Sequence, residues 1–305
     1  MIFYDNTTEG KFYQGIYKLT NSGNSLVVEK SNLIVNGVFT EKNKPKVFLF
    51  IKDRFYHQIV ETFAIILFSI KEDPDTIFIL DLTQQPRLNE LDFLFKYLDE
   101  NNIKYYITNL RKSGPLYVSD FKTYINYQIH KKCVDVLYEM SQKFVKNHKP
   151  FRKVYISRAK TINHSEIAMF GPNNDSSKFN FNNDIRLDND KKMESYFSSL
   201  GFEIIYPEDF LNFNDQLIFF NEVKIIAGVT NAGLLNSIFM QPGGIVLELT
   251  VPLIVYGTEK IHHQYKGLAD VKEHMYLSLF SMRKVDDFID KIENNKMIKE
   301  LLLSS

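Results

Sequence analysis

Residues 225–249 read IIAGVTNAGLLNSIFMQPGGIVLEL, which predicts a strand, a tight turn, a helix, a second turn and another strand. Gly228 closes the first strand, and Gly233 lies in the first turn of the helix. Small residues there let a phosphate approach backbone N–H groups at the positive end of the helix dipole. Glu248 ends the second strand, where a carboxylate can accept hydrogen bonds from ribose hydroxyls. Because the fingerprint GxGxxG is absent, a plain strand–helix–strand unit stays open as the alternative.

Strand-like and helix-like segments alternate on both sides of this stretch. The alternation is typical of parallel sheets with helical crossovers, and we therefore predict an α/β fold. The expected strands are 46–51, 76–82, 104–110, 154–158, 202–207, 224–229 and 245–249. The expected helices include 57–70, 130–147, 189–200, 215–221 and 232–240.

Arg158 ends the strand predicted at 154–158, at the same edge of the same sheet as Glu248. A guanidinium at this place can pair with a diphosphate through two parallel hydrogen bonds. Taken alone, Arg158 is equally compatible with an ordinary surface position. Together with the helix that begins near Ala232, it predicts a site for a phosphate-bearing ligand.

The first half of the chain holds a second pair of candidate residues. His57 and Glu61 are four residues apart, on one face of a predicted helix that follows a predicted strand. Such a pair can act as a general base and its orienting partner. The alternative is a solvated first turn of a helix.

Charge and composition argue against several partners. Lys plus Arg equals Asp plus Glu, at 37 each, so the chain lacks the global basic field that recruits nucleic acid. No apolar run approaches the ~20 residues that span a bilayer, although peripheral contact with a membrane stays open. The single cysteine, Cys133, cannot form an intramolecular disulfide, and no signal peptide is recognisable. We therefore expect a cytoplasmic protein.

The second half resembles glycosyltransferase family 61 in the order and spacing of its motifs. That family includes plant xylan xylosyl- and arabinosyltransferases and animal O-linked N-acetylglucosaminyltransferases. The matching motifs are Ser157-Arg158, Arg186 to Asp190, Gly201-Phe202, Pro207-Glu208, Asp215-Gln216, Gly228 to Asn236, Phe239, Pro242-Gly243 and Glu248-Leu249. The first half resembles the family more weakly, through Phe55-Tyr56-His57 and Glu61.

The resemblance implies a GT-B fold, in which two Rossmann-like domains with parallel sheets face a central cleft. We expect an acceptor-side domain at 1–148, a domain that binds the nucleotide sugar at 149–283, and a C-terminal helix at 284–305 that packs back on the first domain. It also implies an inverting, metal-independent transferase that moves a sugar from a UDP-linked donor to a glycan acceptor. No cofactor is expected, since the nucleotide-sugar donor is itself a substrate.

The resemblance and the pattern together assign the site residues. Glu61 is the expected catalytic base, with His57 as the second candidate. No metal site is expected, because no Asp-x-Asp motif stands at a clear strand end and the resemblance places the pattern at 188–190 at a helix start. The expected donor-binding residues are Arg158, Arg186, Thr230, Asn231, Ala232, Gly233, Leu234, Asn236 and Glu248.

Two residues depart from the family pattern. The family has histidine where this chain has Thr230, and glycine where it has Asn231. Thr230 can still give one hydroxyl hydrogen bond, and Asn231 tolerates a left-handed backbone. Two other functions therefore stay open. One is a different GT-B-like transferase that modifies polysaccharides, such as a pyruvyl transferase, and the other is a non-catalytic homologue that binds a nucleotide or a glycan.

Overall fold

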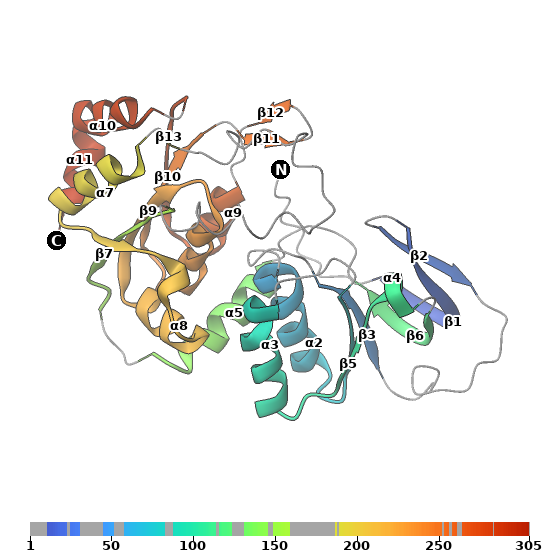
Figure 1. The fold of residues 1–305 in the computed structure, drawn as a ribbon. Coiled ribbons are helices and arrows are strands. Elements are labelled where there is room, and N and C mark those ends of the chain that lie inside the picture. Colours follow the sequence, from blue (N-terminus) through green and yellow to red (C-terminus); the bar gives the residue numbers. More distant parts are fainter. Residues whose placement is uncertain are drawn as a thin grey trace. The chain divides into compact units, whose positions relative to one another are not determined.

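The computed structural model forms two compact units, Ile2–Leu137 and Tyr138–Ser305. Figure 1 shows their elements coloured along the chain from blue to red. The contacts divide the chain at Leu137, and the domain bounds expected from the sequence stay a prediction. The described residues are 11–22, 25–30, 45–51, 58–82, 88–113, 116–123, 131–145, 149–158, 187, 189–251, 253–255, 258–260, 264–282 and 284–304.

A six-stranded sheet with the order β2-β1-β6-β3-β4-β5 forms the centre of the first unit. Strands β6, β3, β4 and β5 are parallel, whereas β1 and β2 are antiparallel to their neighbours. The strands are β1 (Lys11–Ser22), β2 (Ser25–Lys30), β3 (Lys46–Phe50), β4 (Ile77–Asp81), β5 (Tyr105–Thr108) and β6 (Leu116–Thr123). The predictions for β3, β4 and β5 are confirmed, whereas β1, β2 and β6 were not predicted.

The helices of the first unit follow the predicted crossovers. Between β3 and β4 the chain forms a single π-helical turn, η2 (Gln58–Phe63), which continues into α2 (Ala64–Glu72). Helix α3 (Leu88–Glu100) connects β4 to β5, and Phe63 packs edge-on against its Phe93 and Tyr97 rings. The remaining helices are α4 (Leu110–Ser113) and α5 (Lys131–Gln142), whose second half belongs to the second unit.

The second unit is built on a five-stranded sheet in which every strand is parallel, with the order β13-β10-β9-β7-β8. Its strands are β7 (Arg152–Ile156), β8 (Glu203–Ile205), β9 (Val223–Val229), β10 (Ile245–Thr250) and β13 (Met275–Phe280). All but β13 were predicted. The two sheets confirm the predicted α/β class with parallel sheets.

One face of this second sheet is covered by α7 (Asp190–Ser199), α10 (Val285–Asn294) and α11 (Lys296–Leu303). Leu247 and Leu249 share a buried cluster with Phe288 and Leu302 from the last two helices. Apolar side chains of the segment 284–305 thus pack on the sheet of their own unit. Its packing on the first domain stays a prediction.

Helix α7 begins and ends where its sequence predicts. The side chain of Asn189 accepts a hydrogen bond from the Lys192 N–H at 2.9 Å, which caps the first turn. The helix ends before Gly201, whose φ of +81° is the left-handed conformation that favours glycine. These two signals fix the first and last turns of the helix.

Helices η6 (Ala232–Phe239), α8 (Phe213–Asn221) and α9 (Gln264–Val271) pack together, and η6 also contacts β9. η6 is a 3₁₀-helix, and its side chains from Leu234 to Phe239 are all buried. The short elements η5 (Pro207–Asp209), β11 (Leu253–Val255) and β12 (Thr258–Lys260) complete the unit.

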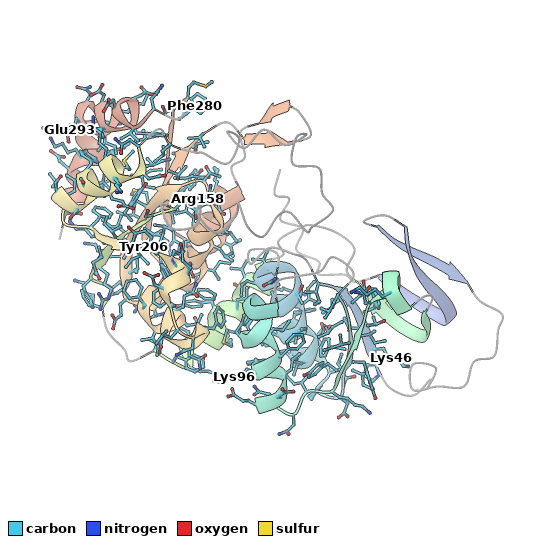
Figure 2. All side chains as sticks on the ribbon, in the orientation of Figure 1. Lys46, Lys96, Arg158, Tyr206, Phe280 and Glu293 are labelled. Atoms are coloured by element: carbon cyan, nitrogen blue, oxygen red, sulfur yellow. The ribbon has the colours of Figure 1, made fainter. Side chains whose placement is uncertain are left out.

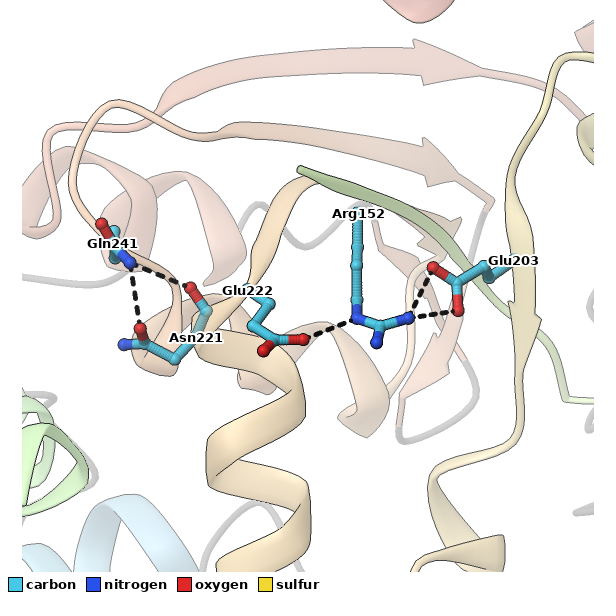
Figure 3. Close-up of polar contacts among 5 residues, drawn as sticks. All are labelled: Arg152, Glu203, Asn221, Glu222 and Gln241. Carbon is cyan, nitrogen blue, oxygen red and sulfur yellow. Dashed lines mark hydrogen bonds and ion pairs between the residues drawn. The ribbon is translucent and has the colours of Figure 1, made fainter. Parts of the chain in front are cut away.

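Arg152 links the starts of three neighbouring strands (Figure 3). Its guanidinium donates to Glu222 at 2.9 Å and to both oxygens of Glu203 at 2.9 and 2.8 Å. The rings of Phe151 and Phe219 lie 5.0 and 4.8 Å from the same group. Because these residues lie at the amino ends of the strands, this network stabilises the edge of the sheet opposite to the one at which parallel sheets bind ligands.

Within the described part of the chain, no helix combines the length and the apolar character that crossing a membrane requires.

Candidate functional site

The order of the second sheet reverses between β7 and β9. From β7 the chain moves outward to β8, then returns to the other side of β7 and continues through β9, β10 and β13. Open parallel sheets bind ligands outside the carboxyl ends of the strands at such a reversal. Ser157 and Arg158 directly follow β7, and Thr230 and Asn231 directly follow β9. These residues therefore mark the candidate site.

Asn231 caps the helix that follows β9. Its Oδ1 accepts from the Gly233 N–H at 2.6 Å, and its own carbonyl accepts from the Leu234 N–H at 3.2 Å. The amide of the exposed Ala232 has no acceptor within the described residues. Two of the N–H groups that the sequence predicts to bind a phosphate, those of Gly233 and Leu234, therefore donate within the turn itself. The Ala232 N–H remains available to a phosphate oxygen.

Gly233 is required by packing as well as by any ligand. A Cβ atom at this position would lie 2.5 Å from the Ile156 side chain and 3.2 Å from the Pro207 ring. Both distances are shorter than an ordinary van der Waals contact. The first turn of η6 therefore sits directly against the end of β7 and the start of η5, which brings the two sides of the sheet reversal together.

Glu248 is fully buried, and hydroxyl groups of the protein donate to both of its carboxylate oxygens. Thr230 Oγ1 donates to Oε1 at 2.6 Å, and Tyr276 Oη donates to Oε2 at 2.5 Å. Burial and the Glu248 carboxylate raise the pKa of Tyr276 well above its ordinary value, so this hydroxyl keeps its proton. A ribose hydroxyl could reach Glu248 only by joining or replacing these internal donors.

Leu234 and Asn236 support the turn from inside. Leu234 is fully buried, and the Asn236 side chain accepts from Gln216 Nε2 at 2.7 Å and donates to the Gly233 carbonyl at 2.8 Å. The motif residues Gln216 and Asn236 thus bond to each other. We therefore do not expect the side chains of Leu234 and Asn236 to touch a donor, although they hold the residues that can.

A second polar group lies beside this turn, where α7 faces the ends of β7 and β8. Ser157 Oγ donates to Glu194 Oε1 at 2.5 Å, and Tyr206 Oη donates to the same oxygen at 2.9 Å. Burial raises the pKa of Tyr206, and so does its hydrogen bond to Glu194. Figure 2 labels Tyr206 and Arg158 in this unit.

Arg158 is half-buried and lies close enough to Asp190 for its positive charge to affect the pKa of that carboxyl group. Burial raises the pKa of Asp190, and the positive charge of Arg158 opposes that rise. Glu194, one turn further along α7, raises the pKa of Asp190 through its own negative charge. Among the described residues at this edge of the sheet, Asp190 is therefore under the influence of one positive and one negative side chain. Within the described residues, no group of His, Cys, Asp or Glu side chains could hold a metal ion.

Several predicted site residues lie outside these two groups. His57 and Arg186 are outside the described residues, as is Asp188 of the Asp-x-Asp pattern. Glu61 lies in η2 of the first unit, on the segment that follows β3, as the sequence predicts. Its proposed role as a base stays a prediction.

Three residues of the site were missed from the sequence. Tyr276 belongs to β13, a strand with no recognised signal, so its approach to Glu248 could not be predicted. Glu194 follows Asp190 by four residues on a predicted helix, and that spacing places both carboxylates on one face. Tyr206 is the last residue before Pro207, which closes the predicted strand at 202–207. Its position at the carboxyl end of a strand indicates a residue at the ligand-binding edge of the sheet.

The arrangement is suited to an anionic ligand that also carries hydroxyl groups. The Arg158 guanidinium and the Ala232 amide can donate to phosphate oxygens, and the carboxylates can accept from hydroxyls. A family model described as Glycosyltransferase 61 matches residues 55–247, more than half of the chain. No curated protein matches the chain.

Proposed function

Because the chain belongs to the glycosyltransferase 61 family and is a glycosyltransferase, we propose that it transfers a sugar from a UDP-linked nucleotide sugar to a glycan acceptor. The reaction inverts the anomeric carbon and uses no metal ion or other cofactor. We propose an enzyme of the GT-B type, in which the second unit binds the donor and the first unit binds the acceptor.

The reversal of the second sheet carries this proposal. It places Arg158 and the start of η6 at the point where parallel sheets bind nucleotides. The guanidinium and the Ala232 amide hold the diphosphate, and the helix dipole adds positive potential. When the sugar leaves, negative charge develops on the nucleoside diphosphate, and these fixed donors stabilise it in place of a metal ion.

Thr230 and Asn231 act on the donor indirectly. The only hydroxyl proton of Thr230 is donated to Glu248, so this residue fixes the end of β9 rather than donating to a phosphate. The side-chain oxygen of Asn231 likewise makes an internal hydrogen bond, which it accepts from the Gly233 N–H. The second candidate function, a homologue that binds a nucleotide without turnover, rests on the presence of these two residues in place of the family's histidine and glycine.

The acceptor hydroxyl needs a base on the side opposite the leaving group. We assign this role to Glu61, which follows the first parallel strand of the first unit. A carboxylate is ionised at neutral pH, and burial can raise its pKa toward the working pH. His57 then orients Glu61 or binds the acceptor.

Nucleotide binding and transfer test the proposal. Calorimetry with UDP, GDP and their sugars should find a ligand for the full chain, and Arg158→Ala should weaken binding of that nucleotide by about 1.5–3 kcal/mol, the range for a charged hydrogen bond. Lys191→Ala removes an exposed cation from the first turn of α7 and is the matched control. Binding without transfer in an acceptor screen would favour the non-catalytic homologue. Transfer that stops in excess EDTA and returns with Mn²⁺ would refute the metal-independent mechanism.

A further inference from the structure

Glu194 is a carboxylate that the fold holds in place through one oxygen. Ser157 and Tyr206 both donate to Oε1, at 2.5 and 2.9 Å. Within the described residues, Oε2 receives no hydrogen bond, and the side chain is partly exposed. The two donors come from the ends of β7 and β8, so the carboxylate is oriented by the sheet rather than by its own helix alone.

Glu248, the carboxylate expected from the sequence to bind ribose, differs in both respects. It is 0% exposed, and both of its oxygens accept from Thr230 and Tyr276. A new hydroxyl would have to enter a closed site and compete with two short hydrogen bonds. Of the two carboxylates, Glu194 is therefore the one with an accessible oxygen.

The surroundings of Glu194 match a ligand with a diphosphate next to a hydroxyl-bearing ring. Arg158 follows Ser157 directly, and its charge acts on Asp190, one turn before Glu194 on the same helix. The start of η6 lies against Ile156 and Pro207, the residues that precede Ser157 and follow Tyr206. A diphosphate bound by Arg158 and η6 would place the adjoining ring beside α7.

We infer that Glu194 accepts hydrogen bonds from a hydroxyl pair on a ring attached to the donor diphosphate, and that Ser157 and Tyr206 position its carboxylate for this contact. The inference rests on the proposed function, since it needs a nucleotide-bound diphosphate. Two rings carry such hydroxyls, the ribose of the nucleoside and the transferred sugar. A carboxylate is suited to both, because each hydroxyl donates to a charged acceptor.

Calorimetry on the full chain with UDP, 2′-deoxy-UDP and UDP-glucose distinguishes the two rings, and GDP, 2′-deoxy-GDP and GDP-mannose form a parallel set. If Glu194 binds ribose, the wild-type chain should prefer the ribonucleotide by about 10-fold or more, and Glu194→Gln should lose about 10- to 100-fold in affinity together with that preference. If it binds the transferred sugar, Glu194→Gln should lose the same factor only for the nucleotide sugar.

Glu300→Gln is the matched control, because it removes an exposed carboxylate from α11 of the same unit. Its affinities for all the ligands should stay within about two-fold of wild type. The 2′-deoxy ligands test the ribose contact on the unmodified chain, so this result does not depend on how well a variant folds.

The inference is overturned if the wild-type chain binds UDP or GDP but Glu194→Gln binds the nucleotide and the nucleotide sugar as tightly as wild type. If no nucleotide binds the wild-type chain, the proposed function fails instead, and the two failures are distinct.

Discussion

Replacing His274 with Gln tests how far the stability of the second unit, and its pH dependence, rest on one neutral, buried imidazole. His274 is 7% exposed, its Nδ1 accepts from the Gly244 N–H at 3.1 Å, and its Nε2 lies 2.9 Å from the Ser237 carbonyl. Since a carbonyl can only accept, Nε2 carries the proton. A second proton on Nδ1 would face the Gly244 N–H, so protonation of the ring breaks that hydrogen bond.

Burial lowers the pKa of His274 to about 4, the hydrogen bond to Ser237 opposes this effect, and the charge of Lys272 adds to it. An unfolded chain takes up the proton near pH 6.5, so between pH 6.5 and 4 the unfolded state binds more protons than the folded one. Stability is therefore lost as the pH falls through this window. At about 1.4 kcal/mol per pH unit, the loss from this residue approaches about 3 kcal/mol near pH 4.

Urea unfolding of wild type and His274→Gln between pH 8.5 and 4 measures this contribution. Hydrogen exchange of peptides that contain Ser237 or residues 274–280 restricts the measurement to the second unit. At pH 7 we expect the variant to be less stable, by about 1–3 kcal/mol, because two buried hydrogen bonds are disturbed. From pH 7 to 4 the difference between the two proteins should shrink by about 3 kcal/mol.

The alkaline range provides the internal control. Between pH 7 and 8.5 the imidazole is neutral in both states, so the two stability curves should run parallel. Carboxylates also titrate at acid pH, but they do so in both proteins and cancel in the difference. A difference that stays constant down to pH 4 would refute the assignment of a low pKa to His274.

Three further predictions concern the sheet edge, the turn and the base. Arg152→Met should lower the free energy of unfolding by about 1–2 kcal/mol, because its partly exposed carboxylate partners lose their cation. An unchanged urea midpoint would contradict this. Gly233→Ala should cost about 1–3 kcal/mol, because the new Cβ lies 2.5 Å from Ile156, and it should weaken UDP binding as well. Thermal unfolding and calorimetry on one preparation would test both effects, and unchanged values would show that the turn adjusts freely. Glu61→Gln should lower kcat by about 10²- to 10⁴-fold with nucleotide affinity intact, as expected for a general base. Transfer at the wild-type rate would place the base elsewhere.

The α/β class and most of the parallel strands could be predicted from the sequence. The predicted strands at 46–51, 76–82 and 245–249 are present because buried parallel strands are continuous apolar runs. The N-terminal pair β1–β2 and the strands β6 and β13 were missed. Strand β13 reads MYLSLF, a run as apolar as the IVLELT of β10 beside it, although it lies at the edge of the sheet and its residues are half-buried or exposed.

The family and its motif from Gly228 to Asn236 could also be recognised in the sequence. The spacing from Gly228 to Asn236 predicted a turn and a helix, and both are present. The capping bond from Gly233 N–H to Asn231 is a local interaction between residues two apart, so it was within reach of sequence reasoning.

The accessibility of the two carboxylates, Glu248 and Glu194, depends on contacts between residues far apart in the sequence. Glu248 is closed by Thr230 and Tyr276, which are 18 and 28 residues away in sequence, and Glu194 is held by Ser157, 37 residues before it. These partners meet because their strands are neighbours in the sheet. Hydropathy and spacing indicate that a strand exists, but they do not encode which strand lies beside it, because apolar faces pack together without directional preference. The environment of a side chain at the end of a strand therefore follows from the strand order, which forms only when the whole sheet assembles.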